Sequence, residues 1–140
     1  MGKFIKSSDS ESLNTSKAKM NKHGDIEWRL KNGKLHKEDG PAVELGNGHY
    51  KAWYLNGKLH RKDGPAIEQG DKIRKWYLND KLHREDGPAV IDPVIKKWYL
   101  KGKLHRKDGP AVIRHNGDKF WYLNGLRHRE DGPAIERGNG

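Results

Sequence analysis

A histidine followed three residues later by an aspartate occurs in five places, and it is the pairing in this chain best suited to chemistry. The pairs are His36/Asp39, His60/Asp63, His83/Asp86, His105/Asp108 and His128/Asp131. A histidine oriented by a carboxylate can act as a general base, or it can bind a metal ion with the carboxylate as its hydrogen-bond partner. Either role would make the chain an enzyme or a metalloprotein.

Three features of the pattern favour a structural role instead. Five equivalent copies fit a repeated structural need better than one active site, and no serine or cysteine nucleophile recurs beside them. Equivalent histidines would lie about 10 Å apart, too far to share a zinc ion whose ligands lie at about 2.1 Å. The chain has no cysteine, which excludes disulfides and thiolate metal sites. We therefore expect no catalytic residue, no metal and no cofactor.

The partner of each aspartate is left open by the sequence. An aspartate in a turn usually accepts a hydrogen bond from the backbone N–H two residues later, but here that residue is a proline, which has none. The carboxylate must then bind a glycine or alanine N–H, the imidazole, or a neighbouring arginine. We expect the histidine and aspartate to hold together the segment that links successive units.

The pairs belong to an internal repeat that organises most of the chain. Tryptophan recurs at positions 28, 53, 76, 98 and 121, and Asp-Gly-Pro follows each in the same rhythm, so the repeat is about 23 residues long. We number five units from these tryptophans. Only 32% of residues are hydrophobic and 34% are charged, which is thin for an ordinary globular core. A linear array resolves this, because each unit needs to bury only a few side chains against its neighbours.

Each unit carries the signals of two strands and two turns. Pro-Ala-Val/Ile starts one strand, a variable turn follows, and the chain returns through Trp-Tyr-Leu to an Asn-Gly turn. No segment shows ten residues of helical periodicity. We expect an all-β fold, an elongated single-layer solenoid of antiparallel β-hairpins with five units. The period of two places each Trp and Leu on one face and each Tyr on the opposite face.

The ends of the array raise separate expectations. Residues 1–21 are polar and are expected to form a flexible tail, followed by the repeat domain over residues 22–140. Residues 24–27 have the pattern of a returning strand that lacks its first half, and residues 136–140 stop at a turn. Unpaired strand edges invite pairing with another chain, whereas coverage by the tail or simple fraying would prevent it. Self-association through the terminal strands is therefore one alternative.

The net charge of +10 suggests an anionic partner, and nine of these charges belong to the repeats. Acidic residues interleave with the cationic rows, so a solvated surface explains much of this charge as well. A tyrosine row bordered by arginines has the composition of a protein interface. The predicted partner-binding residues are Tyr54, Tyr77, Tyr99, Tyr122, Arg61, Arg84, Arg106 and Arg129.

The repeat resembles the MORN family, whose units of about 23 residues contain a tryptophan or phenylalanine, Asn-Gly-Lys and a following histidine. Trp53, Asn56-Gly57-Lys58 and His60 match this spacing over residues 22–140. After the histidine, MORN repeats have glycine, whereas this chain has arginine or lysine and then Asp-Gly-Pro. It is more similar to variant repeats found in phage and large-virus proteins. The resemblance implies stacked hairpins and a phage or viral accessory protein that binds or inhibits a host factor.

We therefore expect a non-enzymatic protein–protein interaction module. The alternative is a nucleic-acid or anionic-lipid binder that uses the lysine and arginine rows. The N-terminus has no apolar signal segment, and no run approaches the length of a membrane span. The expected location is cytoplasmic, in a host cytoplasm if the protein is of phage or viral origin.

Overall fold

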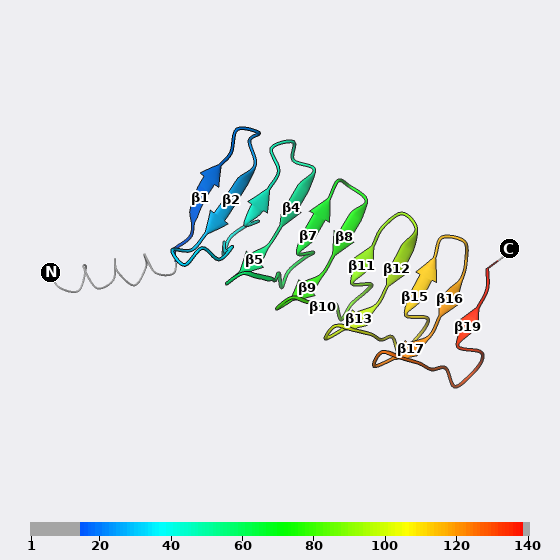
Figure 1. The fold of residues 1–140 in the computed structure, drawn as a ribbon. Helices are drawn as coiled ribbons and strands as arrows, with labels where there is room; N and C mark the ends of the chain where they lie inside the picture. Colours follow the sequence, from blue (N-terminus) through cyan, green and yellow to red (C-terminus); the bar gives the residue numbers. More distant parts are fainter. Residues whose placement is uncertain (1–14, 139–140) are drawn as a thin grey trace, which may run out of the picture.

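The fold is a long antiparallel sheet with a row of small hairpins beyond one end of its strands (Figure 1). The computed structural model describes residues 15–138, and no helix occurs among them. Eleven strands form the long sheet in the order β1-β2-β3-β4-β7-β8-β11-β12-β15-β16-β19. Their bounds are β1 Lys17–Met20, β2 Ile26–Arg29, β3 Val43–Glu44, β4 Tyr50–Ala52, β7 Ile67–Gln69, β8 Ile73–Lys75, β11 Val90–Ile91, β12 Ile95–Lys97, β15 Val112–Arg114, β16 Lys119–Phe120 and β19 Ile135–Glu136. The prediction of an all-β, elongated array of antiparallel hairpins is confirmed.

Units 2 to 5 each add a second, two-stranded hairpin that is separate from the long sheet. These hairpins are β5 Tyr54–Leu55 with β6 Lys58–Leu59, β9 Tyr77–Leu78 with β10 Lys81–Leu82, β13 Tyr99–Leu100 with β14 Lys103–Leu104, and β17 Tyr122–Leu123 with β18 Leu126–Arg127. Their two-residue turns have positive φ at both positions, for example Asn56 at 49° and Gly57 at 78°. Such turns match the twist of the flanking strands, which is why Asn-Gly is favoured there.

The prediction that the returning strand continues through the tryptophan is wrong. Trp-Tyr-Leu was predicted to continue the strand of the long sheet, and the following segment to be only a link. Instead the strand ends one residue before Trp53. The Trp53 N–H donates to the Ala66 carbonyl at 2.8 Å, and the Trp53 carbonyl accepts from the His60 N–H at 3.0 Å. This exchange of partners turns the chain out of the long sheet, so the predicted link is itself a hairpin.

The N-terminal end of the array also differs from expectation. Residues 24–27 were predicted to lack the first half of their hairpin, but β1 supplies it by pairing Ala18 with Trp28 and Met20 with Ile26. Strand β1 lies inside the segment predicted to be a tail, and the rest of that prediction, over residues 1–14, lies outside the described residues. At the other end, β19 pairs with β16 alone among the described strands.

The buried interior of the array consists mainly of alanine. Ala42, Ala52, Ala66, Ala89 and Ala111 have no solvent exposure, and none of the described larger side chains is fully buried. The alanine that follows Asp-Gly-Pro sits where the two hairpins of a unit diverge. At this point its carbonyl accepts from the tryptophan N–H, as Ala89 does from Trp76 at 2.8 Å. Small side chains are required here because the backbone approaches closely.

Replacing Ala89 with leucine should destabilise the fold by about 1 to 3 kcal/mol, because a fully enclosed site cannot accept three more carbon atoms without strain. The measurement is the free energy of unfolding from urea denaturation. Val94→Leu is the control, since Val94 is 63% exposed and surface changes stay within about 0.5 kcal/mol. Equal stability of A89L and the wild type would contradict the assignment of Ala89 to a closely packed corner.

Candidate functional site

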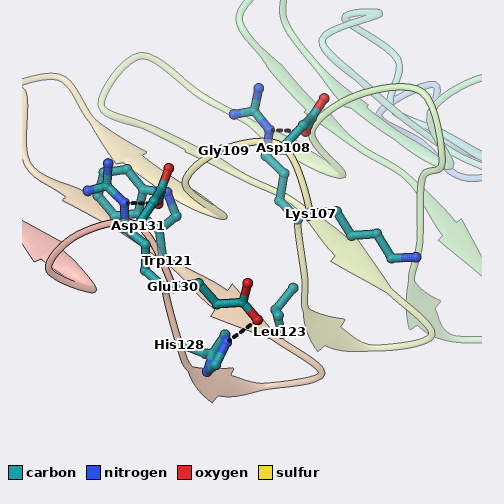
Figure 2. Close-up of a pocket in the computed structure, with 10 residues that line it drawn as sticks. Lys107, Asp108, Gly109, Trp121, Leu123, His128, Glu130 and Asp131 are labelled. Carbon is teal, nitrogen blue, oxygen red and sulfur yellow. Dashed lines mark hydrogen bonds and ion pairs between the residues drawn. The ribbon is translucent and has the colours of Figure 1, made fainter.

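Four similar grooves of about 640 to 750 Å³ follow one another along the array, one between each pair of consecutive units. One wall is the loop after the histidine of the earlier unit. The floor and the other wall come from the tryptophan, leucine, histidine and loop of the later unit. Figure 2 shows the groove between units 4 and 5, with Trp121, His128 and Asp131 of the later unit on one side and Lys107 and Asp108 of the earlier unit on the other.

A cation lies over the face of every tryptophan ring, and we call this contact the Trp–Arg stack. The ring centroids lie 3.9 Å from the guanidinium carbon of Arg61 in unit 2 and 3.9 Å from that of Arg84 in unit 3. The distance is 4.0 Å for Arg106 and 3.8 Å for Arg129, and in unit 1 Lys37 takes this place at 4.2 Å. Such contacts contribute about 0.5 to 2 kcal/mol each.

Each stacked arginine also binds two groups of its own loop. In unit 3 the Arg84 Nε donates to Asp86 at 2.9 Å, and its Nη1 donates to the Pro88 carbonyl at 3.1 Å. The same pair of bonds recurs at Arg61, Arg106 and Arg129. The hydrogen bond from Arg84 lowers the pKa of Asp86 below its ordinary value. Of the partners that the sequence left open for the aspartate, the neighbouring arginine is therefore the one observed.

The grooves carry no excess charge. Each is lined by three cationic and three anionic side chains, as with Arg61, Lys62 and Arg84 against Asp63, Glu85 and Asp86 between units 2 and 3. The other three grooves have the same balance. Since the stacked arginines are already paired, the positive charge of the chain is found mainly on lysines outside the grooves, such as Lys58, Lys81 and Lys103.

The histidines join consecutive units and form no hydrogen bond or ion pair with the aspartates with which the sequence pairs them. Nδ1 of His36, His60, His83 and His105 accepts a hydrogen bond at 2.9 to 3.1 Å from the first turn residue of the following unit. An acceptor at Nδ1 requires the tautomer that is protonated at Nε2. The described residues contain no group of three or more histidine, aspartate and glutamate side chains placed to bind a metal.

The tyrosine side chains lie outside the grooves, although the backbone N–H of Arg61 donates to the Tyr77 carbonyl at 3.1 Å. Trp and Leu of units 2 to 5 line the grooves, and no tyrosine lines any of the four, as the alternation of the strand predicted. Tyr54, Tyr77 and Tyr99 are half-buried, and burial raises the pKa of each phenol. The grooves therefore bring together the predicted arginines without the predicted tyrosines, and the role of both sets in binding stays a prediction.

The groove floor is the part of the site that the sequence prediction missed. Tryptophan and leucine were predicted to share one face but were not among the predicted partner-binding residues, yet they are the apolar surface between the charged walls. The signal was present, because an arginine follows the tryptophan by eight residues in units 2 to 5. A cation at a fixed distance from an aromatic residue in successive units indicates a stacked pair.

Comparison with known proteins does not add a relationship: no protein-family model, no curated protein and no solved structure matches the chain. The resemblance to MORN-type repeats therefore stays a prediction. Over the described part of the chain, no helix is long and apolar enough to cross a membrane.

The role assigned to the histidines can be tested with two of them. His83→Ala removes the acceptor for the Lys101 N–H and should lower the free energy of unfolding by about 1 kcal/mol or more. His128→Ala is the matched control, because no described unit follows it, and it should change stability by less than about 0.5 kcal/mol. Urea denaturation of both variants measures the difference. Equal losses would show that the histidines stabilise their own units and not the next one.

Stability should fall at alkaline pH because of the tyrosine row. The ordinary tyrosine pKa is 10.0, and burial raises that of Tyr77 in the folded chain. The stabilising contribution is complete below pH 10 and is lost as pH rises through the raised pKa. Titration of the phenolate ultraviolet absorbance, with the urea-unfolded chain as the reference, should show some tyrosines ionising at higher pH in the folded protein. Superimposable titrations would contradict the half-buried placement.

Proposed function

We propose that the chain is a non-enzymatic protein-binding module whose grooves each accept part of an extended partner. The observation that supports this most is the balance of charge in each groove around an apolar Trp–Leu floor. A phosphate backbone gains most from unpaired cations, whereas the arginines here are stacked and paired. Protein interfaces combine aromatic residues and arginine with a polar rim, and these grooves have that composition.

The partner is proposed to be a host factor, on the basis of the sequence resemblance to phage and large-virus repeats alone. Nucleic acid or anionic lipid remains the second candidate. The exposed lysines at the small hairpin turns favour it, because Lys58, Lys81 and Lys103 recur once in each of units 2 to 4 and take part in no ion pair among the described residues. Binding through these lysines would be strongly salt-dependent, whereas binding in the grooves would not.

The test is selection from a random peptide library displayed on phage, with the full chain as bait. Selected peptides should bind with affinities that change little between about 50 and 200 mM salt, where a phosphate-binding protein would lose orders of magnitude. Leu100→Ser, in the floor of the groove between units 3 and 4, should weaken binding by about tenfold, equivalent to about 1.4 kcal/mol.

Leu126→Ser is the matched control, since Leu126 is 73% exposed and lines none of the four grooves. Thermal unfolding by circular dichroism separates lost binding from lost folding. Equal binding by L100S and L126S would argue against the grooves. Displacement of the peptides by a single-stranded oligonucleotide, with steep salt dependence, would favour the second candidate.

A further inference from the structure

The five units differ at one position on the face of the long sheet. The second residue after the alanine of Asp-Gly-Pro-Ala is Glu44, Glu68, Ile91, Ile113 and Glu136 in units 1 to 5. In unit 2 this glutamate reaches the stacked arginine, with 3.5 Å between Arg61 Nη1 and Glu68 Oε1. In unit 5 the corresponding distance from Arg129 to Glu136 is 2.6 Å. In units 2 and 5 the fold therefore places a second carboxylate beside the stacked arginine.

Units 3 and 4 lack this carboxylate. Isoleucine occupies the position, and the ion pairs of Arg84 and Arg106 are with Asp86 and Asp108, which are each 87% exposed. The strand register also places Lys96 opposite Ile91 on one side and Ile113 on the other. By contrast, Lys51 lies between Glu44 and Glu68, and its Nζ is 3.8 Å from Oε1 of Glu44. Lys96 is exposed and forms no ion pair among the described residues.

The neighbouring acidic groups are engaged elsewhere. The Asp92 carboxylate accepts from the N–H groups of Val94 and Ile95 within its own turn. Asp118 accepts from the Gly138 N–H and contacts Arg137. The surface between them thus combines two apolar side chains, a lysine without an ion pair, and two arginines that lack the second carboxylate of their counterparts Arg61 and Arg129.

We propose that this surface docks an acidic segment of a protein partner, and we call it the acidic-segment patch: Ile91, Lys96 and Ile113 with Arg84 and Arg106. The proposal rests on the proposed function and names the chemistry of the partner. Carboxylates of the partner would take the places that Glu68 and Glu136 fill in the flanking units. Its apolar groups would cover the two isoleucines, which a phosphate backbone has no means to do.

The spacing of cations on this face defines the segment further. Arg74, Lys96 and Lys119 lie on alternate strands of one row, which is about 9.6 Å between neighbours at about 4.8 Å per strand. A polyproline II segment rises about 3.1 Å per residue with three residues per turn, so every third side chain lies on one side about 9.3 Å apart. This row of three cations, with Lys96 of the patch at its centre, therefore fits a segment with an acidic residue at every third position.

The experiment is a titration of the ¹⁵N-labelled full chain with a peptide of about nine residues that has glutamate at every third position and proline and alanine between. Amide shifts should concentrate at Ile91, Lys96 and Ile113. The double variant I91E/I113E supplies the missing carboxylates internally and should weaken binding at least about tenfold, because like charges would then face the peptide. It should fold normally, since glutamate already occupies this position in the other three units.

The control N47D/Q69E adds the same two negative charges at exposed turn and strand-end positions and should change affinity by less than about twofold. Unchanged affinity of I91E/I113E, or an equal loss in N47D/Q69E, would overturn the proposal. So would an oligonucleotide that binds the same amides more tightly than the peptide. Groove-selected peptides give a separate readout: if they still bind I91E/I113E, the array keeps its protein-binding function whatever the outcome at the patch.

Discussion

Each unit of this protein depends on the next one because the fully buried interior is made of alanine. Alanine side chains enclose too little apolar surface to hold a unit together alone, so the remaining stability must come from contacts along the array. The backbone N–H of Arg84 donates to the Tyr99 carbonyl at 3.0 Å, and the Gly102 N–H donates to the Leu82 carbonyl at 2.8 Å. The histidine bond and the strand ladder complete this set. The Trp–Arg stack then fixes the loop that carries Asp-Gly-Pro.

The sequence predicted the parts of the fold that depend on local chemistry. Asn-Gly fixes a tight turn by its freedom at positive φ, and the alternation of Trp, Tyr and Leu fixes which side chains share a side. The turn of the chain at Trp53 was not predictable in this way. It depends on hydrogen bonds between Trp53 and two residues, Ala66 and His60, that lie seven or more positions away. Strand β1 was missed because Lys17–Met20 is short, exposed and polar, so its pairing with β2 leaves no hydrophobic pattern.

The site was predicted less well than the fold, and the reason is physical. A row of arginines in a sequence indicates positive charge but not how much of it is used by the protein itself. Here an aromatic ring, an aspartate and a proline carbonyl occupy most of each guanidinium. The unpaired positive charge lies on lysines, which the sequence does not distinguish from the paired arginines. Units differ at single equivalent positions, such as Glu68 in unit 2 and Ile91 in unit 3. The residues shared by all units do not distinguish them.

The two kinds of bond between units run in opposite directions: the histidine accepts from the turn of the following unit, and the Arg84 N–H donates to the Tyr99 carbonyl of the following unit. Every internal boundary presents the same two surfaces. Duplication or loss of one whole unit therefore preserves the histidine bonds at the boundaries that remain. In evolution, the number of units then sets the length of the partner segment that the protein can span. Substitutions within a unit alter which part of the partner is recognised at that point of the array.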